Sequence, residues 1–171
     1  MIEINQLGTE DVFIVNHLAN EIWPHAYGGI LSKDQLDYML DWLYDINTLR
    51  EKVQIGYLYY LIKENGVAKG YMALEPNYPD AGFLRIHNIY VLPDQQKKGL
   101  GRAMMNHAID IAFDLDLKRL HLNVNRFNKA RDFYERLGFN VIGEEDIDIG
   151  KGYLMEDYIM ELDLFPNRPL P

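Results

Sequence analysis

The sequence contains no cysteine. This absence excludes a disulfide framework, a thiolate zinc site and a cysteine nucleophile. The chain also has no uncharged apolar run of roughly 18 residues, the length a membrane-spanning helix needs. The N-terminal residues 1–6 lack the basic and apolar regions of a signal peptide. We therefore expect a cytoplasmic protein that does not bind a membrane.

Positive charge is scarce as well. The 17 Lys and Arg residues are outnumbered by 26 Asp and Glu residues, which gives a net charge of −9. Sequence-independent binding to nucleic acid needs a basic surface, so a nucleic-acid partner is not expected. Long-range attraction instead favours cationic partners. With 171 residues, 48% of them apolar, the chain has the composition of one globular domain.

Hydrophobic periodicity and turn residues predict alternating strands and helices. Strands are expected at 2–5, 55–63, 67–75, 83–92, 119–124, 139–145 and 153–163, and helices at 9–21, 32–43, 99–115 and 128–137. Thr9 and Ser32 are the expected N-caps of the first two helices, and Asn65-Gly66 is a hairpin turn. This order predicts an α/β (α+β) single domain over residues 1–165, with helices on both faces of a mixed sheet. The tail 166–171 contains three prolines and forms no regular element.

The most informative segment runs from Val91 to Arg102 and reads VLPDQQKKGLGR. A strand ends at Pro93, a polar loop follows, and a helix begins at the glycines. The first N–H groups of a helix have no intrahelical acceptor, and together with the helix dipole they attract anions. Two glycines would let a phosphate approach the main chain closely, and Lys97, Lys98 and Arg102 add positive charge. The segment therefore predicts a phosphate-binding loop, although two glycines can also occur in a merely solvated loop.

Two common phosphate-binding motifs do not fit this loop. A Walker loop requires GxxxxGK[ST], which the sequence does not contain. The dinucleotide fingerprint GxGxxG requires a third glycine where Met104 stands, and it normally occupies the first strand-to-helix turn. A nucleotide-binding protein is therefore not predicted.

The loop residues Gln96-Lys97-Lys98-Gly99-Leu100-Gly101 resemble the [Q/R]-x-x-G-x-[G/A] pyrophosphate loop of the GCN5-related N-acetyltransferase (GNAT) family. A second stretch, 122–139, is similar to the later family segment L-x-V-x-x-x-N-x-x-A-x-x-F-Y-x-x-x-G-F. The segments 27–33 and 148–153 look most like the bacterial branch that includes spermidine/spermine acetyltransferases.

The resemblance implies acetyl-CoA as a cosubstrate and no metal. In related enzymes the strand before the loop binds the pantetheine arm and the acetyl oxygen through its backbone, and the residue matching Asn128 contacts the CoA arm. The cofactor-binding residues implied are Ile89, Tyr90, Val91, Gln96, Lys97, Lys98, Gly99, Leu100, Gly101, Arg102, Asn128 and Ala130. The side chains of Ile89, Tyr90 and Val91 can equally belong to the hydrophobic core of the sheet. Asn128 can equally be the N-cap of a helix.

Tyr134 is the predicted general acid. A phenol with a pKa of about 10 carries its proton at neutral pH, and a thiolate whose conjugate acid has a pKa of about 8.5 can accept it on departure. The position also suits a core tyrosine whose hydroxyl is hydrogen-bonded.

The general base is less clearly marked. His87 is preferred, because it shares a strand face with Ile89 and Val91 in a regular strand and titrates in the useful range. Glu75, Glu21 and His25 are the other candidates, and His87 is also readable as a structural strand histidine. No His, Asp or Glu set has convincing metal-ligand spacing.

An acceptor pocket is expected from the loop 23–31 and the final hairpin around 146–153. Trp23, His25 and Tyr27 would supply aromatic walls, and Glu144, Glu145, Asp146 and Asp148 negative charge. This pairing suits a small primary amine, with a polyamine as one candidate; an acidic hairpin can also serve solubility alone. The alternatives are acetylation of a protein N-terminus or lysine, and a CoA-binding module without turnover. Assembly as a homodimer is a further option.

Overall fold

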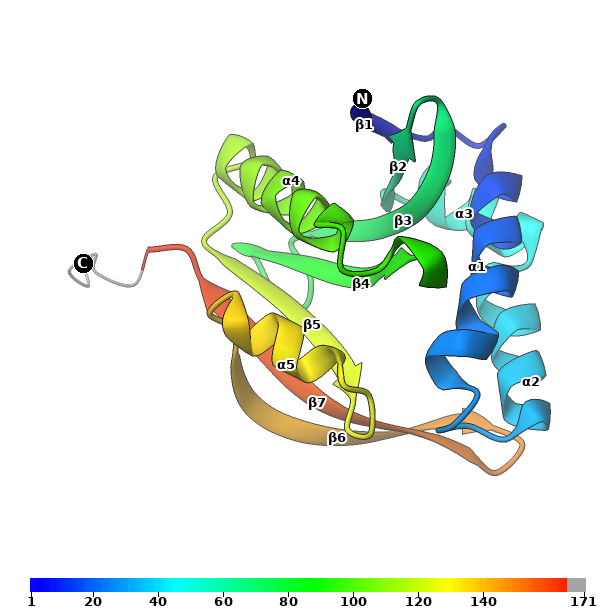
Figure 1. The fold of residues 1–171 in the computed structure, drawn as a ribbon. Coiled ribbons are helices and arrows are strands. Elements are labelled where there is room, and N and C mark those ends of the chain that lie inside the picture. The colour runs from blue at the N-terminus through cyan, green and yellow to red at the C-terminus, as the bar shows by residue number, and fades with distance from the viewer. Residues whose placement is uncertain (166–171) are drawn as a thin grey trace. The chain divides into compact units, whose positions relative to one another are not determined.

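The structure is a computed structural model in which residues 1–165 are described; the tail 166–171 lies outside the described residues. The elements are β1 (Ile2–Gln6), α1 (Val12–Tyr27), α2 (Lys33–Tyr44), α3 (Ile46–Gln54), β2 (Leu58–Glu64), β3 (Val67–Pro76), β4 (Phe83–Val91), a short 3₁₀ turn (Pro93–Gln95), α4 (Leu100–Asp114), β5 (Arg119–Asn125), α5 (Ala130–Arg136), β6 (Asn140–Gly150) and β7 (Tyr153–Asp163) (Figure 1). The strand order is β1-β2-β3-β4-β5-β7-β6. The predicted mixed α/β fold is confirmed.

The predicted elements recur with shifted ends, and one helix was not predicted. Ser32 caps α2 as expected, its hydroxyl accepting from the N–H of Gln35 at 3.2 Å. The first helix begins at Val12 rather than after Thr9, and it continues through Pro24 to Tyr27. The additional helix α3 follows α2 directly and is capped by Asp45, whose carboxylate accepts from the N–H of Thr48 at 3.2 Å.

The chain forms two compact units, and the first comprises residues 1–75 and 87–108. Its strands β1, β2 and β3 are antiparallel neighbours. The turn between β2 and β3 places Asn65 at φ 51° and Gly66 at φ 81°, as the Asn-Gly pair predicts. The helices α1, α2 and α3 pack on one another (Figure 1).

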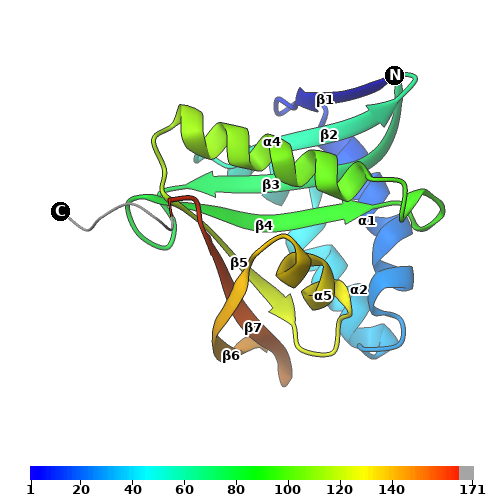
Figure 2. The ribbon, with the colours of Figure 1, turned by 60° about the vertical axis from the view of Figure 1, so that its left-hand side comes forward.

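Both faces of the β2–β3 pair are covered by helices. Side chains alternate between the two faces of a strand, and Tyr71 and Tyr60 lie on opposite faces, since Tyr71 is paired with Leu61 and not with Tyr60. Trp23 of α1 donates its indole N–H to the Tyr71 hydroxyl at 3.2 Å. His107 of α4 packs edge-on against Tyr60, with ring centroids 4.9 Å apart. Within the first unit, α1 and α4 therefore lie on opposite faces, as predicted (Figure 2).

The second unit comprises residues 76–86 and the chain from residue 109 onward. Here the first half of β4 runs parallel to β5, and β5, β7 and β6 follow as antiparallel neighbours. One face of β5 buries Leu120, Leu122 and Val124, and α5 runs alongside this strand (Figure 2). The opposite face carries His121 and Asn123, so it is polar. Among the described residues no helix is both long and apolar enough to cross a bilayer.

Candidate active site

The predicted phosphate-binding loop lies wholly in the first unit. β4 ends at Val91, and the next residue, Leu92, donates its N–H to the Lys69 carbonyl at 2.9 Å, which fixes the end of the strand beside β3. The 3₁₀ turn leads to a loop in which Lys97 has φ 65° and Gly99 φ 84°. Both angles belong to the left-handed region that glycine adopts most readily. The carbonyl of Gly99 then accepts the first α4 bond, from Ala103 N–H at 3.0 Å.

This geometry suits an anion such as a pyrophosphate. The N–H groups in the first turn of α4 have no intrahelical acceptor and lie at the positive end of the helix dipole. A β-carbon on Gly99 would meet no atom within 4 Å, so the space beside the loop is open. Lys97, Lys98 and Arg102 are all exposed. Buried Gln95 anchors the loop and accepts from the Lys98 ammonium at 3.3 Å.

The second half of β4 departs from a regular strand. Tyr90 packs against Tyr71, with ring centroids 5.6 Å apart, and His87 hydrogen-bonds to Glu75. Tyr71 and Glu75 are four residues apart in β3 and share one face, so His87 and Tyr90 share a face as well. Residues three apart in a regular strand would point to opposite faces. The alternation of side chains is therefore interrupted between His87 and Tyr90. The expectation that His87 shares a face with Ile89 and Val91 stays a prediction.

A glycine on β3 accompanies this irregularity. The carbonyl oxygen of Tyr90 lies only 2.4 Å from where a β-carbon of Gly70 would stand, and the Val91 α-carbon lies 3.2 Å from that point. Any side chain at position 70 would displace the main chain of β4. Sequence reasoning missed this residue, although a glycine inside a predicted strand signals close approach of another backbone.

A group of aromatic residues packs against Tyr90 in the first unit. Trp23 lies 5.8 Å from Tyr90 between ring centroids, and the Tyr27 and Tyr90 hydroxyls are hydrogen-bonded at 2.6 Å. Beneath them, the buried Tyr71 hydroxyl donates to Tyr44 at 2.7 Å. Burial raises the pKa of both Tyr71 and Tyr44 well above the ordinary tyrosine value, so these two hydroxyls stay protonated. Trp23 and Tyr27 belong to the last turns of α1, not to a loop.

The four candidates for the base differ sharply in environment. Glu21 is exposed on α1 and faces His17 at 3.6 Å, and His25 is exposed on the same helix. His87 and Glu75 are instead in contact, with Nε2 of the ring 3.1 Å from a carboxylate oxygen and both side chains 21% exposed. Tyr57, just before β2, stacks on the His87 ring at 4.6 Å. The predicted base is thus a half-buried histidine with a carboxylate partner.

In the second unit, a tight loop after β5 leads into α5. The Asn125 side chain accepts from the N–H of Phe127 at 2.9 Å, and the Asn128 side chain accepts from the N–H of Ala130 at 2.9 Å. The capping role predicted for Asn128 is thus present, although the helix begins at Ala130 with Lys129 in the N-cap position. Its role toward a CoA arm stays a prediction.

Tyr134 lies in the middle of the short helix α5 and is 8% exposed. Its ring packs edge-on against Phe139, which follows the helix, at 5.7 Å between centroids. At the end of the helix the N–H of Phe139 donates to the Tyr134 carbonyl at 3.1 Å, and Gly138 takes φ 101°, which is typical of a glycine just past a helix. The ring is therefore held firmly, which suits both a packing role and a positioned proton donor.

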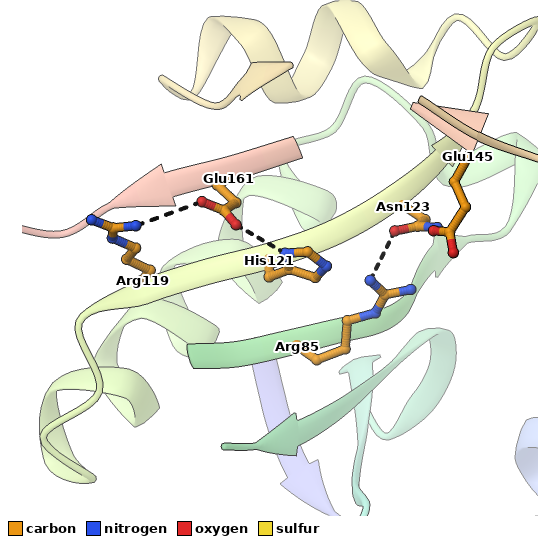
Figure 3. A network of polar contacts seen from close by, with 6 residues as sticks. All are labelled: Arg85, Arg119, His121, Asn123, Glu145 and Glu161. Carbon is orange, nitrogen blue, oxygen red and sulfur yellow. Dashed lines mark hydrogen bonds and ion pairs between the residues drawn. The ribbon is translucent and has the colours of Figure 1, made fainter. Parts of the chain in front are cut away.

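Polar side chains connect the strands of the second unit on the β5 face that carries His121 and Asn123 (Figure 3). Arg85 of β4 donates to the Asn123 side chain at 2.9 Å, and Asn123 donates to Glu145 at 3.1 Å. His121 contacts Glu161 at 3.2 Å, and Glu161 lies 3.9 Å from Arg119. Burial lowers the pKa of His121, with Arg85 acting in the same direction.

Asp157 belongs to the same group of polar side chains. It is 3% exposed, and its carboxylate accepts from Asn123 at 3.2 Å. Burial raises the pKa of Asp157, while the hydrogen bond from Asn123 opposes that rise. The sequence analysis did not identify this network, because its members are separated along the chain and meet only through strand pairing.

The acidic residues of the final hairpin are largely engaged within the second unit. Arg126 approaches Asp146 at 2.8 Å, and Glu145 accepts from Asn123. Asp148 accepts from the N–H of Gly150 at 2.8 Å. Among the described residues no group of three or more His, Asp or Glu could hold a metal ion. Less negative charge is thus available to an amine than the sequence suggests.

The chain is similar to several known proteins. Among solved structures, it is similar to the PaiA N-acetyltransferase of Thermoplasma acidophilum, in complex with coenzyme A. The similarity has a TM-score of 0.80 and 25% identity, over 95% of this chain and 99% of that one. An L-amino acid N-acyltransferase, MnaT of Escherichia coli, is 32% identical over 72% of this chain and 73% of its own length. A peptidyl-lysine N-acetyltransferase, YjaB of Escherichia coli, is 32% identical over 56% of this chain and 58% of its own length.

These relatives are named for amino acids and peptidyl-lysine, and the similarity to spermidine/spermine acetyltransferases stays a prediction. The model of the acetyltransferase (GNAT) family matches residues 16–139, a span that contains the glycine-bearing loop and Tyr134. The chain therefore belongs to the acetyltransferase (GNAT) family.

Proposed function

We propose that this N-acetyltransferase transfers an acetyl group from acetyl-CoA directly to the primary amine of a small molecule. The observation that carries the proposal is the loop between β4 and α4, where positive φ angles at Lys97 and Gly99 precede an open helix N-terminus. Its exposed cations and main-chain N–H groups fit a pyrophosphate. When bound, acetyl-CoA supplies an acetyl group activated as a thioester.

The roles proposed for the chain's own residues are those that the family resemblance implies. In the proposal, the main chain of Ile89, Tyr90 and Val91 holds the pantetheine arm and the acetyl oxygen. The segment Gln96–Arg102 binds the pyrophosphate, and Asn128 and Ala130 contact the CoA arm. Residues 1–165 would act as one N-acetyltransferase domain.

Two proton transfers accompany the exchange of bonds. The amine nitrogen forms a bond to the carbonyl carbon while the carbon–sulfur bond breaks. His87 takes the proton that the amine loses, and Tyr134 gives its proton to the departing sulfur. No covalent enzyme intermediate is needed, which agrees with the absence of cysteine.

Among small amines we propose cationic acceptors, polyamines included. The net charge of −9 favours the approach of a cation, and Trp23, Tyr27 and Tyr90 form an aromatic group of the kind that attracts ammonium. The engaged carboxylates of the final hairpin weaken the local part of this argument. Acetylation of a protein is the second candidate, favoured by the similarity to a peptidyl-lysine N-acetyltransferase.

A panel of acceptors tests the proposal. Release of free CoA thiol is followed with spermidine, L-amino acids and peptides that carry a single lysine or a free N-terminus. We expect a higher kcat/KM for small amines than for peptides. Faster turnover of peptides would favour the second candidate, and no turnover of any amine would contradict the proposal. A cytoplasmic location and a homodimer stay predictions; size-exclusion chromatography tests the latter.

A further inference from the structure

We propose that Glu75 is a positioning residue for His87: it holds the imidazole so that Nδ1, and not Nε2, takes the proton from the acceptor amine. This inference rests on the proposed role of His87 as the base. It deepens that role by naming the reacting atom and a second residue that the reaction needs.

The two side chains come from different strands of the first unit and meet on one face. Glu75 stands near the end of β3, and His87 lies where β4 becomes irregular. The contact joins Nε2 of the ring to Oε1 of the carboxylate at 3.1 Å, within hydrogen-bond distance. With both side chains 21% exposed, water competes only partly for this bond. The Glu75 carboxylate is therefore a stable hydrogen-bond partner of the His87 ring.

This bond selects one tautomer of the neutral ring. An ionised carboxylate only accepts hydrogen bonds, so Nε2 must carry the hydrogen that it donates to Glu75. In a neutral imidazole the other nitrogen, Nδ1, then holds the lone pair. Glu75 itself directs an oxygen at the ring, which suits it to orient the base rather than to act as the base.

The plane of the ring is fixed by a second contact. Tyr57 stacks on His87 with centroids 4.6 Å apart and an interplanar angle of 11°. The Lys52 ammonium also lies over the Tyr57 ring, 5.9 Å from its centroid. A stacked ring can rotate little about its side-chain bonds, so the direction of Nδ1 is set by the carboxylate and the stacked phenol together.

On the way to the amide the ammonium loses two protons. One goes to Nδ1 before the attack, and the other, lost when the carbon–nitrogen bond forms, restores the proton that Tyr134 gives to the departing sulfur. On taking the first proton, the ring becomes an imidazolium with hydrogens on both nitrogens. The Glu75 carboxylate then faces a positive ring, which it stabilises, as a carboxylate does for a catalytic histidine elsewhere. After the acetyl group has been transferred, the imidazolium returns its proton to solvent.

Steady-state kinetics test the role of the carboxylate. Glu75→Gln keeps an oxygen that can accept from Nε2 but removes the charge, so we expect kcat to fall at least about tenfold, within the range of a general base. The KM for acetyl-CoA should stay within about twofold. Glu3→Gln, at an exposed position of β1, is the matched control and should leave both values unchanged. Wild-type kcat in Glu75→Gln, where chemistry limits the rate, would overturn the proposal.

NMR of nitrogen-15-labelled histidine tests the tautomer independently of activity. In the neutral wild-type protein we expect hydrogen on Nε2 of His87, with the signal assigned by its loss in His87→Gln. In Glu75→Ala we expect a mixture of tautomers. Hydrogen on Nδ1 in the wild type would overturn the proposal even if Glu75→Gln were inactive or poorly folded. An inactive wild-type protein with the Nε2 tautomer would instead contradict the proposed function and leave the positioning contact standing.

Discussion

The carbonyl oxygen of Tyr90 occupies the space beside Gly70, 2.4 Å from where a β-carbon would lie. This relationship joins two sequence features that look unrelated, a glycine inside β3 and the strand segment assigned to the acetyl group. The irregular course of β4 brings its main chain this close to β3. Position 70 thus controls the backbone on which the proposed acetyl contacts depend.

Gly70→Ala is therefore expected to damage both stability and cofactor binding. The added methyl group must push the Tyr90 main chain away, and overpacking of this kind costs about 1–3 kcal/mol of unfolding free energy. Urea denaturation measures that loss, and calorimetric titration with CoA should show weaker binding. Gly8→Ala is the control, because a β-carbon there meets no atom within 4 Å. Equal stability of the two variants would show that β4 does not depend on Gly70.

Most of the fold was predictable because short local sequence patterns determine its turns, caps and strands. The Asn65-Gly66 turn, the Ser32 cap and the glycines before α4 are short signals that act through their own backbone. The helix α3 was not predictable from its apolar stripe, since only Leu49 in it is buried. The first helix was expected to end at residue 21, yet α1 continues through Pro24 to Tyr27, with Trp23 buried just before the proline.

The site was predictable only in part, for a physical reason. A motif names residues along one segment, and the loop 96–101 was proposed as a binding site in this way. The pairing of His87 with Glu75 depends on two strands and on an irregularity in β4. Reasoning from the two-residue period of a strand assumes a regular backbone, so it could not show that His87 and Tyr90 share a face. Local sequence patterns also did not predict the partners of Asp146 and Glu145, because Arg126 and Asn123 reach these carboxylates only through strand pairing.

Gly101→Val tests the phosphate-binding loop. A branched side chain in the first turn of α4 should obstruct an anion on the main-chain N–H groups and weaken acetyl-CoA binding more than tenfold, a loss of about 1.4 kcal/mol. Asn106→Val places the same side chain on an exposed position of the same helix and controls for helix propensity. If both variants bind acetyl-CoA as the wild type does, the loop is not part of the site.

Tyr134→Phe tests the general acid. The ring keeps its packing against Phe139 while the proton donor is lost, so kcat should fall on the order of 100- to 10,000-fold. Affinity for CoA should change little, because the interaction is made mainly in the transition state. Tyr60→Phe removes a hydroxyl from β2 and should retain activity. Wild-type turnover of Tyr134→Phe, with chemistry shown to limit the rate, would leave Tyr134 a packing residue.

His121 predicts a pH dependence of stability. Burial lowers its pKa in the folded protein, so the unfolded chain binds more protons between the folded value and the ordinary value of 6.5. Stability from this group is therefore present above pH 6.5 and is lost as the pH falls through that range. Urea denaturation at pH 7.5 and pH 5 should show a larger loss for the wild type than for His121→Gln. The same loss in both proteins would assign the pH dependence to other groups.

The acceptor prediction concerns charge. If a cationic amine is attracted by the net charge of −9, rising salt should raise its KM more than that of a neutral acceptor, since screening acts on the charge term alone. Neutralising Asp146 and Asp148 together should act in the same direction.

The structure limits the expected size of that effect, because Arg126 already approaches Asp146 at 2.8 Å, and Asp146→Asn would release this cation as well as remove an anion. The double variant is therefore compared with Arg126→Gln, which frees the carboxylate and should lower the KM of spermidine. A KM indifferent to salt and to all three substitutions would rule out a cationic acceptor; the assignment to N-acetyltransferases, which rests on the loop and on the family match, would be unaffected.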